Sequence, residues 1–138
     1  MKAIEQILKD SKTVAVVGMS NKPDRASNEV AHYLQQHGYK VIPVNPTYAG
    51  QEILGEKVYA SLQDAAAGLP ECRIDVVDCF RKPDDMLQVT LDAIAIGAGC
   101  LWMQLGVVNQ EAADLASSAG LEVVMDHCMK IEHAALGV

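Results

Sequence analysis

Residues 13–17 and the glycine after them restrict the fold of this chain more than any other stretch. The run TVAVV shows no alternation of polar and apolar residues, which predicts a strand buried on both faces, as in a parallel sheet. Gly18 follows directly, then come polar residues and cations, and a helical pattern starts at about residue 28. A strand, a tight glycine turn and a helix N-terminus in this order are typical of α/β proteins that hold a phosphate group.

The alternation of strands and helices continues along the chain. Further strands are expected at 39–44, 74–80, 100–104 and 121–125, and helices at 2–10, 28–37, 61–68, 83–96 and 111–119. The stretch 47–59 predicts a loop with a short extended piece, and the tail from residue 126 predicts an extended segment. We therefore expect one domain over residues 1–138 with an α/β fold: a doubly wound, mainly parallel, Rossmann-like sheet of about five strands with helices on both faces.

Composition and charge argue against several classes of function. Half of the 138 residues are hydrophobic and few are aromatic, which predicts an aliphatic core. The net charge of −7 argues against a protein that binds nucleic acid or an acidic membrane. No signal peptide or membrane span is expected, because charges interrupt the N-terminus and glycines interrupt the uncharged stretch 93–110. Scattered cysteines without a C-x-x-C pair favour reduced thiols in a cytoplasmic protein: Cys72, Cys79, Cys100 and Cys128.

The loop after the first strand departs from the dinucleotide-binding pattern G-x-G-x-x-G. Ser20 stands where the second glycine would be, and its Cβ keeps a pyrophosphate farther from the backbone. Its hydroxyl can instead donate a hydrogen bond to a phosphate oxygen. Lys22 and Arg25 add cations within reach of the loop. The loop alone leaves two interpretations open, a phosphate site or an ordinary turn with solvated cations.

The next two strand ends argue for an anionic ligand other than NAD. Asn45 stands where NAD sites usually carry Asp or Glu for the ribose hydroxyls, although an Asn between prolines can also serve as a turn former. Arg81 and Lys82 precede a predicted helix N-terminus, where the helix dipole disfavours cations. A bound anion would resolve this conflict. Asp84 and Asp85 offer the alternative of local neutralisation, but we favour the anion.

The fourth strand end alternates Trp102 and Gln104 with Leu101 and Met103. Successive strand residues point to opposite faces, so one of these two pairs is expected to face the ligand crevice. Trp102 is more typical of a core. Gln104 is kept as a candidate binding residue.

The sequence contains no strong candidate for a catalytic or metal-binding group of residues. Asp75 and Asp78 lie on opposite faces of a strand and do not form an acid pair. A single short tail rarely supplies tetrahedral metal geometry, and its adjacent histidine and cysteine point apart if the segment is extended. We therefore expect no metal site and no catalytic residue in the group of polar side chains that the tail carries: His127, Cys128, Glu132 and His133.

Short motifs occur along nearly the whole chain, and their order is more specific than any one of them. They are VAVVGMS (14–20) with Pro23 and Arg25, YL (33–34), GY (38–39), PVNP (43–46), ILG (53–55), YASL (59–62), IDVVD (74–78), FR (80–81), WMQLG (102–106) and VMD (124–126). In this order they resemble the small stand-alone CoA-binding proteins. That family is related to the CoA-binding domain of the succinyl-CoA synthetase α subunit and of ADP-forming acyl-CoA synthetases.

The resemblance implies a coenzyme A or acyl-CoA ligand and assigns roles to several residues. Phosphates would be held by Gly18, Ser20, Asn21 and Arg25, and the adenosine would lie near Asn45. Phe80 and Arg81 would lie beside the nucleotide or the start of the pantetheine arm. The tail departs from the family pattern, with His127 where Arg is usual and Met129 where Pro is frequent. The further domains and the phosphorylated histidine loop of the synthetases have no counterpart, so ligase activity is not expected.

The resulting hypothesis is a cytoplasmic module that binds CoA or an acyl-CoA without chemistry of its own. Two alternatives from other classes are an NAD(P)- or other nucleotide-dependent enzyme and a regulatory protein whose interactions depend on CoA. No nucleic-acid or membrane partner is expected. The apolar stretch 101–108 leaves open a homodimer or an unidentified protein partner.

Overall fold

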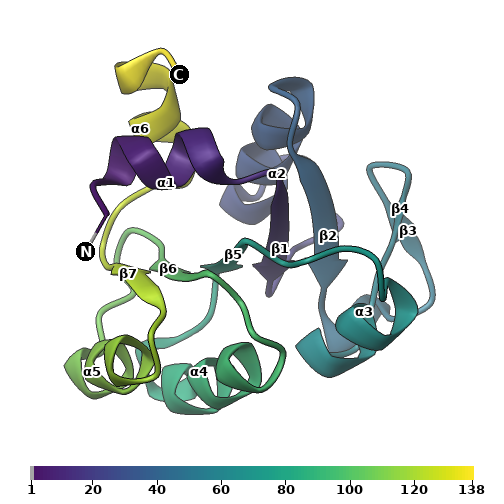
Figure 1. The fold of residues 1–138 in the computed structure, drawn as a ribbon. Coiled ribbons are helices and arrows are strands. Elements are labelled where there is room, and N and C mark those ends of the chain that lie inside the picture. Colours follow the sequence, from purple (N-terminus) through teal and green to yellow (C-terminus); the bar gives the residue numbers. More distant parts are fainter. Residues whose placement is uncertain (1) are drawn as a thin grey trace.

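A five-stranded parallel sheet forms the centre of the computed structural model, which describes residues 2–138 (Figure 1). The strands lie in the order β2-β1-β5-β6-β7. Because β1 lies between β2 and β5, the chain reverses its direction across the sheet after β2. This reversal places a crevice at the carboxyl ends of β1 and β5. The prediction of a parallel sheet of five strands is confirmed, with bounds of Thr13–Val17 for β1, Lys40–Val44 for β2, Val76–Cys79 for β5, Cys100–Met103 for β6 and Glu122–Val124 for β7.

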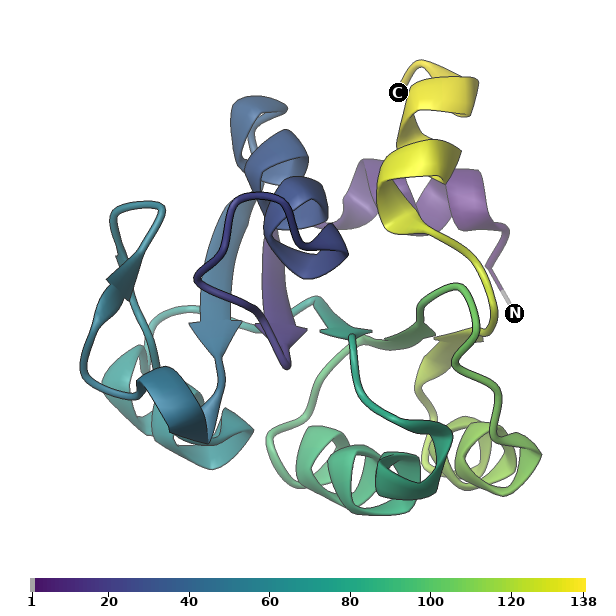
Figure 2. The same ribbon diagram turned by 180° about the vertical axis from the view of Figure 1, so that it is seen from behind.

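Helices cover both faces of the sheet, as the sequence predicted (Figures 1 and 2). One layer contains α1 (Ile4–Asp10), α2 (Ala26–Gln36) and α6 (Met129–Leu136). The opposite layer contains α3 (Leu62–Gly68), α4 (Met86–Ala95) and α5 (Gln110–Ser118). No helix of the described residues is both long enough and apolar enough to cross a bilayer.

The central strands are mostly apolar because each of their faces packs on a helix layer, and the buried carboxyl of Asp78 in β5 is an exception. In β1, Ala15 and Val17 pack toward α3 and α4, while Val14 and Val16 pack toward α1 and α2. Trp102 is fully buried in the α1, α2 and α6 layer. Its indole Nε1 donates to the backbone oxygen of His127 at 2.8 Å. The tryptophan is thus a core residue that also fixes the segment leading into α6.

Two parts of the chain differ from the prediction. The stretch expected to be a loop with a short extended piece carries a 3₁₀ turn at Pro46–Tyr48 and two short extended pieces, β3 (Glu52–Ile53) and β4 (Glu56–Lys57), that pair as a small antiparallel hairpin. Strands of two residues are too short to show an alternating pattern. The tail, expected to be extended, forms α6. No side chain caps this helix at its start, so the usual sequence signal of a helix N-terminus is missing.

The start of α3 follows the capping pattern that the sequence contains. The Ser61 hydroxyl accepts a hydrogen bond from the backbone amide of Asp64 at 3.0 Å. Replacement of Ser61 by Ala should lower the free energy of unfolding by about 1 kcal/mol. Urea unfolding measures the change, and the Ser61→Asp variant is the control because Asp can make the same bond. Equal losses in both variants would contradict the capping role.

Candidate functional site

The carboxyl ends of β1 and β5 meet at Gly18. This residue has φ +83°, and its amide donates to the oxygen of Val44 on β2 at 2.8 Å. A Cβ at this position would overlap the carbonyl oxygen of Phe80 and lie 3.1 Å from Cδ of Arg81. Only glycine permits both this backbone conformation and this close approach. The turn therefore brings the carboxyl ends of β1 and β5 together.

The loop after Gly18 is tied to the first turn of α2. The Ser20 amide donates to the Ser27 hydroxyl at 2.9 Å, and the Asn28 side chain donates to the Ser20 carbonyl at 3.0 Å. The Ser20 hydroxyl oxygen accepts from the Lys22 amide at 3.1 Å, which leaves its own proton free to donate. Figure 2 shows this loop running from the tip of β1 to the start of α2.

A cavity that forms a cradle lies between this loop and the start of α2. Arg25 precedes the helix directly and makes no capping bond to it. The free amides at the start of a helix carry partial positive charge, and Lys22 and Arg25 add full positive charges. No carboxylate lines the cavity of about 390 Å³ within the described residues; its lining consists of Gly18, Ser20, Lys22, Arg25, Ala26, Ser27, Tyr48 and Phe80.

A second cavity lies on the other side of Gly18 and has the opposite charge. Its volume is about 330 Å³, and Asp84, Asp85 and Asp92 line it together with Ser61 and apolar side chains from β1, β2 and α4. Arg81 also lines this cavity, where its Nη2 contacts Oδ2 of Asp85 at 3.1 Å. The local neutralisation that the sequence offered as an alternative is therefore present for Arg81.

A third cavity lies on the α2 side of Phe80. Its volume is about 410 Å³, and it is lined by Ala26, Val30, Phe80, Arg81, Lys82, Gln104, Leu105, Val107 and Cys128. Gln104 is only 4% exposed and donates through Nε2 to Oδ1 of Asp78 at 2.5 Å. Asp78 is completely buried, and its Oδ2 has no partner among residues 2–138. Burial raises the pKa of Asp78 to about 7, although the hydrogen bond from Gln104 acts in the opposite direction.

Most of the residues expected from the sequence gather around Gly18. Ser20, Arg25 and Phe80 line the cradle, and Arg81 lines both neighbouring cavities. Gln104 lines the third cavity as a buried residue. The sequence did not identify Asp78 as part of this site. The sequence signal for Asp78 was the presence of a carboxylate inside the apolar run VVDC (76–79).

The two asparagines expected at the site, Asn21 and Asn45, line neither the cradle nor the two cavities beside it. The Asn45 side chain donates to the Met19 carbonyl at 3.0 Å and accepts from the Thr47 amide at 2.9 Å. It thus acts as the turn former that the sequence left open, and it holds the Gly18 loop from behind. Asn21 lies on the far side of the loop, where it lines a separate cavity.

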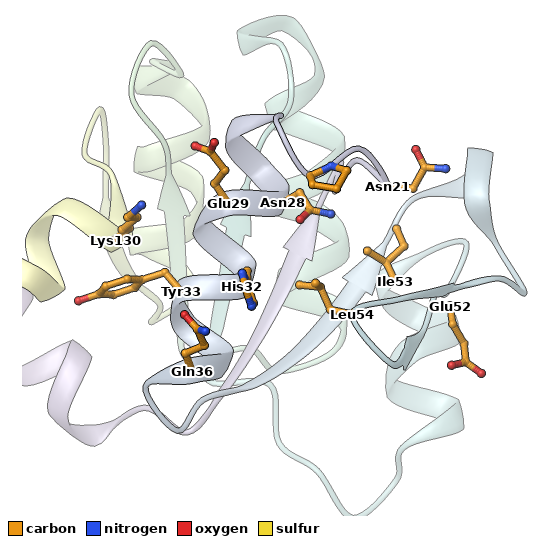
Figure 3. A pocket seen from close by; sticks show the side chains of 11 residues that line it. Asn21, Asn28, Glu29, His32, Tyr33, Gln36, Glu52, Ile53, Leu54 and Lys130 are labelled. Atoms are coloured by element: carbon orange, nitrogen blue, oxygen red, sulfur yellow. The ribbon is translucent and has the colours of Figure 1, made fainter.

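This separate cavity lies between α2 and the β3-β4 hairpin (Figure 3). It is larger, about 680 Å³, and Glu29 and Glu52 line it along with His32, Tyr33 and Lys130. Figure 3 shows Asn21 and Asn28 at one end and Tyr33 and Lys130 at the other. Asn28 is already bonded to the Ser20 carbonyl. The mixed charge of its lining makes this cavity a poorer phosphate site than the cradle.

The polar residues of the tail divide between different partners. His133 Nδ1 lies 2.8 Å from the Tyr33 hydroxyl on α2. His127 Nε2 lies 3.6 Å from Oε1 of Glu132. Over residues 2–138, no three His, Cys, Asp or Glu side chains are grouped as metal ligands.

The close approach at Gly18 predicts a large effect of adding one methyl group. The Gly18→Ala variant should lose several kcal/mol of unfolding free energy, since Phe80 must shift in addition to the strain of about 1–2 kcal/mol from positive φ. Gly38→Ala is the matched control, because Gly38 has φ +91° but open space around its Cβ position. Urea unfolding compares the two variants, and equal losses would show that the contact with Phe80 is unimportant.

The buried carboxyl of Asp78 predicts a pH-dependent stability. Its pKa is raised from the usual 3.8 to about 7, so from about pH 4 to about pH 7 the folded state holds a proton that the unfolded state has lost. Stability should therefore fall as pH rises through this window, by an amount on the order of 2 kcal/mol between about pH 5 and about pH 8. Asp78→Asn should remove that part of the pH dependence in urea titrations. Parallel pH profiles for the two proteins would contradict the shifted pKa.

Comparison with known proteins identifies the family. The CoA binding domain family matches residues 12–134. The uncharacterised protein YneT of Bacillus subtilis is 40% identical over 131 residues, which cover 95% of this chain and 92% of YneT. A hypothetical protein from Pyrococcus horikoshii superposes with a TM-score of 0.89 at 43% identity, covering 98% of this chain and 90% of the other.

A larger enzyme contains a related domain. The dinucleotide-forming acetyl-coenzyme A synthetase 1 of Ca. Korarchaeum cryptofilum, solved with phosphate and ADP, matches with a TM-score of 0.70 and 26% identity. The match covers 89% of this chain but 27% of the synthetase chain. With the sheet order, the glycine turn and these matches in agreement, the chain belongs to the CoA-binding domain family.

Proposed function

We propose that this protein binds coenzyme A or an acyl-CoA at the carboxyl edge of its sheet and performs no chemistry of its own. The observation that carries the proposal is the cradle at Gly18, where helix amides, Lys22 and Arg25 surround a cavity that no described carboxylate lines. Membership of the CoA-binding domain family supports CoA as the ligand class. The cradle would hold the pyrophosphate, because helix N-termini and cations both favour anions.

The second cavity suits the nucleoside part of the ligand. Asp84, Asp85 and Asp92 repel phosphate, and Asp92 can accept hydrogen bonds from an adenine amine or from ribose hydroxyls. Val44, Leu62 and Val89 offer apolar surface to the base. In this arrangement Asn45 supports the loop from behind rather than contacting the adenosine.

Arg81 would exchange partners when the ligand binds. Its present partner is Asp85, and both side chains are more than one third exposed. Exposed pairs of this kind contribute little to stability, so the guanidinium can turn to a ligand phosphate at small cost. The adjacent cradle and the 3′-phosphate of CoA both offer such a partner.

The alternative of an NAD(P)-dependent enzyme has less support. The side chain at the end of β2 is Asn45, whose amide group is already engaged with Met19 and Thr47. It therefore cannot replace the carboxylate that binds ribose hydroxyls in dinucleotide sites.

Isothermal titration with CoA tests the proposal. The Arg25→Ala variant should bind CoA about tenfold more weakly or worse, because a charge-assisted hydrogen bond contributes roughly 1.5–3 kcal/mol. Lys12→Ala is the control, since Lys12 is an exposed cation at the amino end of β1, the opposite edge of the sheet. If the unchanged protein gives no binding heat at several hundred micromolar CoA, the proposal is wrong.

The Arg81–Asp85 ion pair predicts that removing the Asp85 charge raises the affinity for CoA. Asp85→Asn frees the guanidinium and should tighten CoA binding about twofold to fivefold at low salt, in line with the energy of an exposed ion pair. Asp84→Asn removes a carboxylate from the same cavity and serves as the control. In an Arg81→Ala background the gain from Asp85→Asn should shrink to that of Asp84→Asn. An undiminished gain in that background would exclude Arg81 as the group released.

A further inference from the structure

The C-terminal helix α6 is attached to the rest of the molecule through one narrow face. Met129 and His133 are its buried residues, and they lie four positions apart, so they point to the same side of the helix. This side packs against α1 and α2 (Figures 1 and 2), while Ile131 and Leu136 are exposed. A helix of eight residues is marginal in water without tertiary packing. The two buried side chains therefore decide whether α6 stays formed.

His133 lies in a cluster of aromatic rings that joins three helices. Its Nδ1 lies 2.8 Å from the Tyr33 hydroxyl of α2. Its ring meets the rings of His37 and Tyr39 edge to face, with centroids 5.2 and 5.7 Å away, and His37 stacks on Tyr33 at 4.0 Å. The Tyr39 hydroxyl donates to the Leu8 carbonyl of α1 at 2.6 Å. The packing of α6 on both neighbouring helices thus depends on this cluster.

A proton on His133 is unfavourable in this place, because the charges around the cluster are those of cations. His37 is a second imidazole beside it, and the Lys130 ammonium lies 5.7 Å from the centre of the Tyr33 ring (Figure 3). His32 of α2 is exposed and lines the large cavity beside Tyr33. Burial, followed by repulsion from His37, lowers the pKa of His133 from its usual 6.5.

The carboxylates of the surrounding elements do not offset such a charge. Over residues 2–138, none forms an ion pair with His133. On α6, Oε1 of Glu132 lies 3.6 Å from Nε2 of His127. On α2, Glu29 is exposed and lies in the first turn. The carboxylates on α1 and beside β2 pair with lysines: Glu5 with Lys9, Asp10 with Lys2 and Glu56 with Lys40.

We propose that α6 is a pH-sensitive switch, packed on α1 and α2 while His133 is neutral and released when its imidazole takes up a proton. The segment before the helix stays in place, because the Trp102 indole donates to the His127 carbonyl and the His127 amide donates to the Met103 carbonyl. Release is thus confined to the chain from Cys128 onward. Cys128 lines the third cavity, so release would remove one wall beside the proposed ligand. The switch itself needs no ligand, and it stands whether or not CoA binds.

The direction of the pH dependence follows from the two states of the helix. In packed α6 the pKa of His133 is lowered, and in released α6 it returns toward 6.5. The released helix therefore binds the proton more readily, and the ratio of released to packed helix should rise as pH falls below 6.5, by at most about tenfold per pH unit for one proton. The raised pKa of Asp78 acts in the opposite direction, because it favours the folded state in acid.

Hydrogen exchange followed by NMR tests the switch on the unchanged protein. The amides of Glu132 and Gly137 donate to the carbonyls of Cys128 and His133 at the two ends of α6. After correction for intrinsic exchange rates, their protection factors should fall as pH is lowered, by at most about tenfold per pH unit. The amides of α5, on the opposite face of the sheet, are the internal control. Constant protection in α6, or an equal loss in α5, overturns the proposal.

Tryptophan fluorescence and the NMR signals of the histidine rings follow the same event independently. Trp102 is the single tryptophan of the sequence and is fully buried in the α1, α2 and α6 layer. Its quenching by acrylamide should rise over the pH range in which the His133 ring titrates, and this titration should lie below 6.5. A His133 ring that titrates at or above 6.5, or quenching that does not change with pH, contradicts the switch.

Two histidine variants with matched chemistry separate His133 from the rest of the tail. His133→Gln does not titrate but keeps an oxygen that can accept from the Tyr33 hydroxyl, so α6 should stay protected in acid. His127→Gln changes an exposed histidine of the same tail and should keep the acid release. Acid release in His133→Gln, or its absence in His127→Gln, overturns the proposal.

A third variant decides the question where His133→Gln fails to pack α6 even at neutral pH. His37→Gln leaves His133 in place and removes a group that repels its proton. The pKa of His133 then lies closer to its usual value, so the acid release should be smaller than in the unchanged protein. An acid release of unchanged size in His37→Gln overturns the proposal.

Discussion

The contact between Gly18 and the Phe80 carbonyl is the constraint on which the site depends. The absence of a side chain at Gly18 lets the end of β1 pack against the backbone that leaves β5. The carboxyl ends of β1 and β5 lie where the strand order reverses, and α/β sheets bind ligands at such points. All three cavities around the contact use Gly18, Phe80 or Arg81 as a wall. A larger residue at Gly18 would therefore disturb each of them.

Hydrogen bonds to the backbone of the loop keep it open toward a ligand. Asn45 holds the Met19 carbonyl from the β2 side, and Asn28 holds the Ser20 carbonyl from α2. Both carbonyl oxygens are thereby engaged by side chains. Because carbonyls turned into the cradle would repel an anion, these asparagines favour binding without touching the ligand.

The sequence predicted the sheet and its helices except α6, because strands buried on both faces and glycine helix ends are local signals. It also predicted that Gly18, Ser20, Arg25 and Phe80 lie together, since strand carboxyl ends share one edge. It could not predict that Asn45 uses both ends of its amide within the turn, which depends on the fold of the loop. The role of Asp78 likewise appears only when β5 and β6 lie side by side.

The distribution of charge explains how an acidic chain can bind an anionic ligand in one orientation. The net charge is −7, yet the carboxylates near the site line the cavity beyond Gly18, and the helix amides and free cations line the cradle. The third cavity offers a neutral amide. In the proposed binding mode, the nucleoside and the phosphates of CoA would therefore each have one electrostatically favourable place.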